Sequence, residues 1–164
     1  MDEATKILIG TISGFVIAFL AEPVKGYFNN NTLRSRLRRV LYHEVYENFM
    51  LFKKLLQKDL SGISSQDFFQ RTLQKDGYEY AISNEITTFY QLKEAIIFNE
   101  LYLFIKYLCQ INITNNQDAL KEMISLYIES VENGFKDKSL DKQFMVKTVG
   151  KKKFQEFNGV NNES

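Results

Sequence analysis

The feature that most constrains the fold of this chain is an uncharged apolar segment close to its start. Residues Ile7–Ala21 read ILIGTISGFVIAFLA and contain no charged side chain. As a helix this segment is about 22 Å long, and the flanking residues extend it, with Tyr27 and Phe28 suited to a headgroup layer. The sequence therefore predicts one N-terminal transmembrane helix, with residues 1–28 as a membrane anchor.

Two other interpretations compete with an anchor. A cleaved signal peptide requires a basic start and small residues before the cleavage site. This chain instead starts with Asp2 and Glu3 after Met1, and Phe19 lies two residues before Ala21. A buried core helix is the second interpretation, since apolar runs of this length also occur in soluble cores. The basic residues that follow the segment favour the membrane interpretation.

Charges on the two sides of the segment are unequal. Residues 1–6 hold Asp2, Glu3 and Lys6, whereas Lys25 and four arginines follow the segment. The arginines are Arg34, Arg36, Arg38 and Arg39. By the positive-inside rule, this asymmetry predicts a protein of the inner (cytoplasmic) membrane, with its N-terminus outside and its C-terminal domain in the cytosol. The lipid bilayer is then its first expected partner.

Small residues recur along one side of the segment. Gly10, Gly14 and Ala18 follow one another at four-residue steps, and Glu22 continues the row. Small residues in such a row let membrane helices approach closely, which predicts a homo-oligomer interface. Glu22 then has two interpretations, a carboxylate that lines a pore or interface and one that simply lies in the wet headgroup region. Pro23 predicts a kink or an end of the first helix.

The rest of the chain has the composition of a helical domain. It contains one Pro and eight Gly in 164 residues, so few helix breakers are present. Apolar residues at three- and four-residue steps predict an all-α cytosolic bundle of about four to five helices over residues 33–154, followed by a flexible tail at residues 155–164. The expected helices cover about 33–58, 65–76, 84–110, 115–133 and 140–145. Residues 78–82 alternate as a strand does and are ambiguous.

Polar residues predict the ends of these helices. Asn29–Asn31 form a break, and Thr32 is expected to cap the helix that follows. A second break is expected at residues 112–116, where Thr114 and Gln117 make a capping box. Ser139 is expected to cap the last short helix.

The residues that usually carry chemistry are scarce. The chain has one histidine, His43, and one cysteine, Cys109, which lies among apolar residues and is expected to be a buried thiol. No phosphate loop, dinucleotide fingerprint, zinc spacing or nucleophile elbow is present. Glu94 and Glu100 are interpreted as surface charges. These features predict a non-enzymatic protein without cofactor or metal, and a small hydrolase that uses His43 is the alternative.

Two basic segments are candidate ligand-binding sites. The first holds Arg34, Arg36, Arg38 and Arg39. The second, residues 136–153, holds Lys147, Lys151, Lys152 and Lys153, and phenylalanines alternate with its lysines. Cations with aromatic rings can hold phosphates and stack on bases, although solvated basic ends of domains are common. The net charge of +1 gives no reason to expect duplex nucleic acid.

The order of these features resembles a known family. Gly10 and Gly14 in the span, and the four arginines after it, are arranged as in the small membrane effectors that accompany type III CRISPR systems. The resemblance is one of plan over the whole length, and it assigns no binding residue. It implies a cytosolic domain that binds a cyclic oligoadenylate and acts at the membrane in antiviral defence.

The resulting prediction is a non-enzymatic oligomeric membrane protein. Its cytosolic domain is expected to sense an anionic, nucleotide-like ligand or a protein. The alternative is a membrane-anchored scaffold that recruits a partner protein without switching. Growth arrest on expression would favour the first, and harmless expression the second.

Overall fold

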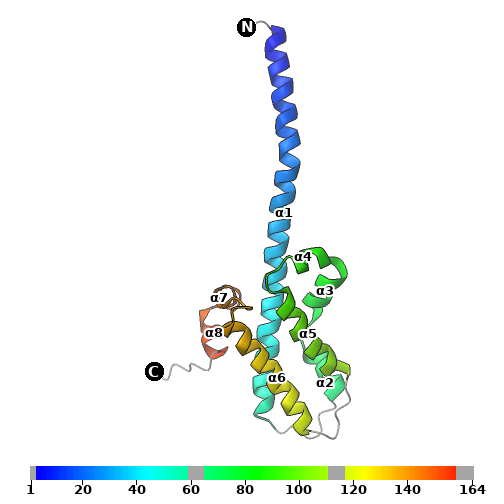
Figure 1. The fold of residues 1–164 in the computed structure, drawn as a ribbon, viewed down its shortest axis with the longest axis vertical. Helices are drawn as coiled ribbons and strands as arrows, with labels where there is room; N and C mark the ends of the chain where they lie inside the picture. Colours follow the sequence, from blue (N-terminus) through cyan, green and yellow to red (C-terminus); the bar gives the residue numbers. More distant parts are fainter. Residues whose placement is uncertain (1–2, 59–64, 111–116, 158–164) are drawn as a thin grey trace. The chain divides into compact units, whose positions relative to one another are not determined.

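The computed structural model describes residues 3–58, 65–110 and 117–157, with side chains described from residue 30 onward except at 65 and 66. Over these ranges the chain forms helices and no strand, which confirms the predicted all-α class. The helices are α1 (Glu3–Leu56), α2 (Ser65–Thr72), α3 (Asp76–Asn84), α4 (Ile86–Tyr90), α5 (Ala95–Gln110), α6 (Gln117–Lys136), α7 (Lys142–Val149) and α8 (Lys151–Phe157) (Figure 1). Two compact units divide the chain, residues 1–36 and residues 37–164.

Helix α1 is continuous from Glu3 to Leu56. The predicted break at Asn29–Asn31, with Thr32 capping a new helix, is therefore wrong. Those positions contain no Gly or Pro, and each Asn or Thr lowers helix propensity by less than about 1 kcal/mol, which long helical flanks offset. The helix also continues through Pro23, so the predicted helix end at this residue does not occur.

The prediction of a transmembrane helix requires correction. Over the ranges that the structure describes, no helix is both long and apolar enough to cross a membrane. The prediction of a single-pass membrane protein is therefore wrong for this part of the chain. The uncharged run Ile7–Ala21 is 15 residues long, below the roughly 20 that a bilayer core requires, and its side chains lie outside the described ones.

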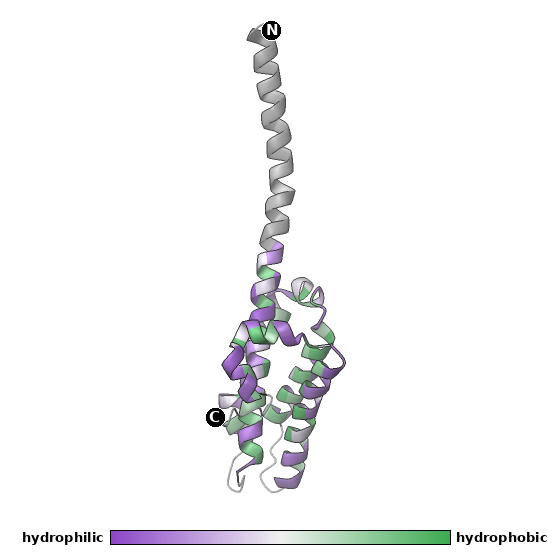
Figure 2. Cartoon of the chain, turned by 90° about the vertical axis from the view of Figure 1, so that its left-hand side faces the viewer, coloured by the Kyte–Doolittle hydropathy of each residue, from purple (hydrophilic) through white to green (hydrophobic). Residues whose placement is uncertain are grey.

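The second half of α1 supplies one side of the core of the second unit. Its buried residues recur at three- and four-residue steps, as the sequence predicted. They include Leu37, Leu41, Val45, Phe49 and Phe52. Hydrophobic and hydrophilic positions alternate along the helices of this unit, as in amphipathic helices around a shared core (Figure 2).

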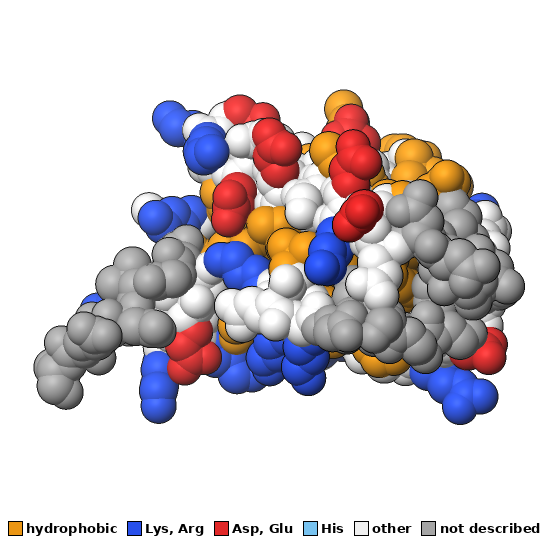
Figure 3. All heavy atoms as spheres, turned by 90° about the horizontal axis from the view of Figure 1, so that it is seen from below, with side chains coloured by type: hydrophobic (Ala, Val, Ile, Leu, Met, Phe, Trp, Pro, Cys, Tyr) orange, Lys and Arg blue, Asp and Glu red, His pale blue; other side chains and the backbone are white. Residues whose placement is uncertain are grey.

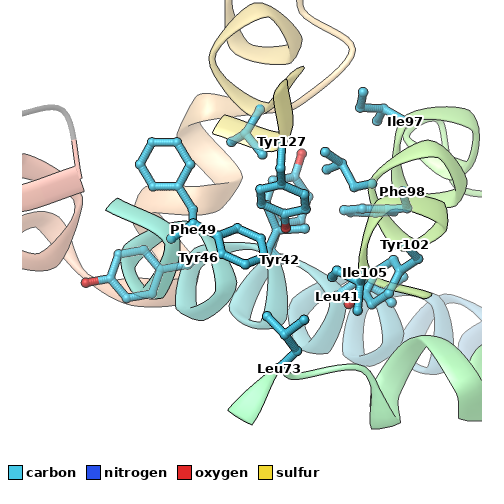
Figure 4. Close-up of a cluster of buried hydrophobic side chains, with 14 of the residues drawn as sticks. Leu41, Tyr42, Tyr46, Phe49, Leu73, Ile97, Phe98, Tyr102, Ile105 and Tyr127 are labelled. Carbon is cyan, nitrogen blue, oxygen red and sulfur yellow. The ribbon is translucent and has the colours of Figure 1, made fainter. Parts of the chain in front are cut away.

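Aromatic rings join the helices in this core. The ring of Tyr42 meets that of Phe98 on α5 edge to face, with centroids 5.4 Å apart, and Phe52 meets Tyr127 on α6 at 4.8 Å. Figure 4 shows the labelled Tyr42, Phe98 and Tyr127 directed into this shared interior. Each such pair contributes about 0.5–1.5 kcal/mol beyond its buried area.

The predicted flexible tail begins too early. Residues 155–157 belong to α8, and Phe157 is only 2% exposed. Its ring stacks on Phe49 of α1, with centroids 4.1 Å apart. Burial of one large ring therefore holds this short helix in the fold. The remainder of the predicted tail, residues 158–164, lies outside the described ranges, as does the predicted break at 112–116.

Three helix assignments differ from prediction. The ambiguous residues 78–82 lie in helix α3, and the long helix expected over 84–110 is divided into α4 and α5 by a turn at residues 91–94. Helix α7 is capped by Asp141, which accepts a hydrogen bond from the amide of Phe144, and not by Ser139. The additional helices α3 and α8, together with the division into α4 and α5, explain why the described helices outnumber the four to five predicted.

Candidate functional site

A buried carboxylate holds the start of α5 to α1. Glu94 immediately precedes α5, and its side chain is 1% exposed. Arg38 of α1, 56 residues earlier, donates to it through Nη2 and through Nε at 3.1 Å. The hydroxyl of Tyr42 donates to the same carboxylate at 3.2 Å. The interpretation of Glu94 as a surface charge is therefore wrong, because its partner is remote in sequence.

The same arginine reaches the start of α7. Nη2 of Arg38 lies 2.8 Å from Oδ2 of Asp141, and Nζ of Lys93 lies 3.0 Å from that oxygen. The guanidinium also lies over the ring of Phe144, 3.8 Å from its centroid. Burial raises the pKa of Asp141, but the bonds from the Phe144 amide, Arg38 and Lys93 outweigh it and hold the pKa far below its ordinary value. Arg38, a predicted ligand-binding residue, is thus bound within the fold to Glu94 and Asp141.

A second buried carboxylate, Glu44, joins α1 to α3 and α5. It accepts hydrogen bonds from the amides of Gly77 at 2.6 Å and Tyr78 at 3.2 Å, and from the hydroxyl of Tyr102. The first amides of a helix have no partner within the helix, and the N-cap residue of α3 makes no side-chain hydrogen bond to them. Glu44 accepts hydrogen bonds from these amides instead. Burial raises the pKa of Glu44, and these three hydrogen bonds only partly oppose it.

The buried carboxylates of this unit join helices to one another. In Glu44 and in Glu94, both carboxylate oxygens accept hydrogen bonds from within the fold. His43 is exposed, and its Nε2 lies 3.7 Å from the carboxylate of Glu47. Cys109 is buried, as predicted, and burial raises the pKa of its thiol, which disfavours the reactive thiolate. Among the described residues, no group of three metal-binding side chains is assembled.

Helix α5 is apolar on two opposite sides. The inner face is buried in the core and consists of Ala95, Ile97, Phe98, Leu101, Tyr102, Ile105, Leu108 and Cys109. On the outside, Ile96 is 77%, Leu103 56% and Tyr107 53% exposed. Steps of seven and four residues place these three within an arc of about 40°, which points away from the inner face. We call these three residues the outer stripe.

A groove borders the outer stripe where α5 packs on α6. It has a volume of about 490 Å³ and is lined by Glu100, Leu103, Phe104, Tyr107, Met123 and Leu126. Helices α5 and α6 form its two walls, and five of its six lining residues are apolar or aromatic. We call this feature the α5–α6 groove.

A cleft of about 710 Å³ lies on the other side of the outer stripe, and Leu103 lines both hollows. The ring of Tyr78 in its wall stacks on Tyr102 with centroids 4.1 Å apart, and the Tyr78 hydroxyl donates to Asn99 at 2.6 Å. At this cleft, Lys75 is paired with Glu79 at 2.7 Å. The outer stripe is therefore a ridge with a hollow on each side.

The charges beside the α5–α6 groove are acidic. Glu100 lines it directly. Glu122 and Glu129 are exposed on α6, four residues before and three after Leu126, so they flank that residue on the helix surface. Figure 3 shows hydrophobic side chains reaching the surface beside acidic ones on the face seen from below. No ion pair among the described residues engages any of these three glutamates.

The predicted basic sites are only partly assembled. Arg34 and Arg36 belong to the first compact unit, whereas Arg38 and Arg39 belong to the second. Lys147 on α7 and the three lysines of α8 are exposed. The α8 lysines are Lys151, Lys152 and Lys153. Lys153 lies close to α1. Its Nζ is 3.9 Å from the carboxylate of Glu47 and 5.7 Å from the ring centroid of Tyr46.

The predicted oligomer residues lie in α1, at its N-terminal end. They are Gly10, Gly14 and Ala18, with Glu22 as the predicted pore or interface residue. Their side chains are outside those that the structure describes, so both assignments stay predictions.

Comparison with known proteins adds no relative. The chain matches no protein-family model, and no curated protein or solved structure is significantly similar to it. The fold and its surfaces therefore define only a class, an all-helical module with an exposed apolar face. The outer stripe was missed from sequence because Ile96 has the same apolar character as core residues such as Ile97 and Leu101. The signal was present, since apolar residues surround α5 more widely than one buried face requires.

Proposed function

We propose that this protein is a non-enzymatic adaptor that binds a partner protein through the outer stripe and the α5–α6 groove. The observation that carries this proposal is the two-sided apolar character of α5. A helix that packs on a core with one side normally has a polar opposite side. In α5 that opposite side instead exposes Ile96, Leu103 and Tyr107.

The energetics favour a protein partner. Full burial of one large apolar side chain contributes about 1.5–3 kcal/mol, and three such side chains lie in one row. Binding must also offset the loss of translational, rotational and side-chain freedom. A rigid row on a regular helix loses little of this freedom, because its backbone is already fixed by the inner face. Clustered apolar exposure of this kind is typical of protein interfaces.

The same residues argue against an enzyme. The two most buried carboxylates hold helices together, and His43 and Cys109 lack the setting of a base or nucleophile. We therefore assign the protein to binding and not to catalysis. This proposal corresponds to the recruiting function considered from sequence.

A paired-variant binding experiment tests the proposal. Ile96→Ala combined with Leu103→Ala should abolish recovery of a partner from the protein's own cells, and weaken binding of the purified partner by about a hundredfold. Lys147→Ala combined with Lys152→Ala, also two exposed positions, serves as the matched control and should retain binding. Equal binding by both variants, with unchanged unfolding curves, would overturn the proposal.

Binding of an anionic ligand is the second candidate function. It is favoured by the exposed lysines of α7 and α8. Two helices joined at Gly150, whose φ is +89°, carry these lysines. A cyclic oligoadenylate titrated calorimetrically should then bind, and Lys151→Ala with Lys152→Ala should weaken it by about tenfold. No measurable heat at low salt would exclude this candidate.

A further inference from the structure

We infer that the partner segment in the α5–α6 groove is a basic amphipathic helix. This inference rests on the proposed function, because it names the chemistry of the partner for the same surface. Two observations carry it. The first is the apolar groove between two helices, and the second is the set of carboxylates beside that groove, for which the described residues form no ion pair.

The shape of the surface fits a helix. The outer stripe extends from Ile96 to Tyr107, about 16 Å or three helical turns. The groove beside it has apolar walls from two helices, Leu103 and Phe104 on α5 and Met123 and Leu126 on α6. An amphipathic helix places apolar residues at i, i+3, i+4 and i+7 into such a groove. A partner helix of three to four turns would match this length.

The acidic residues beside the groove favour a positively charged partner. Glu100 lies in the groove lining, and Glu122 and Glu129 flank Leu126 on the outer side of α6. The six lining residues include no lysine or arginine. Lysine or arginine beside the partner's apolar stripe would therefore be attracted to these carboxylates, whereas acidic residues would be repelled.

The same charges disfavour a second copy of this chain as the occupant. A symmetric contact through this face uses the same patch on both copies. It would bring the Glu100, Glu122 and Glu129 side chains of each copy toward those of the other. A separate basic helix avoids this repulsion.

Two synthetic helical peptides of about 18 residues provide the test. Both carry leucine at i, i+3, i+4 and i+7, and the remaining positions are lysine in one and glutamate in the other. We expect the lysine peptide to bind at least about tenfold more tightly than the glutamate peptide in low salt. Glu100→Lys should weaken binding of the lysine peptide by about tenfold. Glu156→Lys, an identical charge change at an exposed position on α8, is the matched control and should change it less than about twofold.

The outcomes separate this inference from the proposed function. Equal binding of both peptides, lost in Leu103→Ala, would overturn the basic helix and leave the adaptor function intact. Lysine-peptide binding that Leu103→Ala leaves unchanged would overturn both, because the apolar surface would not be the site. A dimer in sedimentation that Leu103→Ala abolishes would identify a second copy as the occupant and overturn the basic helix.

Discussion

The two faces of helix α5 have similar residues and opposite surroundings. Phe98 and Leu101 on the inner face are fully buried against α1 and its neighbours, whereas Ile96 and Leu103 on the outside are largely exposed. The comparison teaches that apolar spacing alone does not say which face builds the core. What differs is the partner, which lies within the chain for one face and, by our proposal, in another protein for the other.

This difference has a thermodynamic consequence. Removal of inner-face atoms should lower the free energy of unfolding, because those atoms are buried only in the folded chain. Removal of outer-stripe atoms should leave unfolding almost unchanged and weaken partner binding. Substitutions along this one helix can therefore test the assignment of both faces.

Phe98→Ala should have the largest effect on folding. The ring is fully buried and meets Tyr42 edge to face, so its loss leaves a cavity and removes an aromatic contact. We expect a loss of about 3–5 kcal/mol in the free energy of unfolding, measured by urea denaturation. A loss below about 1 kcal/mol would contradict the assignment of Phe98 to the core.

Glu94→Gln should have the next largest effect. The variant keeps the size of the side chain but removes the charge that faces Arg38, so a partly buried guanidinium loses one of its two carboxylates. We expect a loss of about 2–3 kcal/mol in urea denaturation. Glu100→Gln on the exposed side of α5 is the matched control and should cost less than about 0.5 kcal/mol. Similar costs for the two variants would mean that Glu94 is not a structural partner.

Much of the fold was predictable from local patterns. The helical class, the buried stripe of α1 from Leu37 to Phe52, and the buried thiol of Cys109 all followed from periodicity and composition. These features depend on neighbours within a few residues, which a sequence displays directly.

The remaining features depend on residues far apart in the chain. Glu94 is buried because of Arg38, and the first turn of α3 is satisfied by Glu44, 33 residues before Gly77. Neither pairing has a signature in the spacing of residues, so Glu94 was assigned to the surface and α3 was left ambiguous. For the site, the sequence indicated that apolar residues surround this helix, but which of them the fold covers is a property of tertiary packing.

Tyr102→Phe should have a smaller, pH-dependent effect on the inner face. It removes the hydroxyl that donates to Glu44, and we expect a loss of about 1–1.5 kcal/mol near neutral pH. Burial raises the pKa of Glu44 above the ordinary 4.5, so its protonation favours folding at acid pH, and this contribution is lost as pH rises through the raised pKa.

The Tyr102→Phe variant should make the dependence of stability on pH stronger. The Tyr102 hydroxyl lowers the pKa of Glu44, so removing it raises the pKa further. The cost of Tyr102→Phe should therefore grow as pH rises from about 4 to about 8, measured by urea denaturation at each pH. A cost that is constant over this range would show that the hydroxyl does not interact with an ionised Glu44.

Leu103→Ala should have the smallest effect on folding. The side chain is 56% exposed, and alanine is at least as good a helix former as leucine, so lost contacts and gained propensity nearly cancel. We expect the free energy of unfolding to change by less than about 0.5 kcal/mol, with an unchanged denaturant slope. Leu101→Ala, the same substitution two residues earlier on the inner face, is the matched control and should cost about 2–5 kcal/mol. Comparable costs at the two positions would mean that Leu103 contributes to the core, and the outer stripe could not then be a surface kept free for a partner.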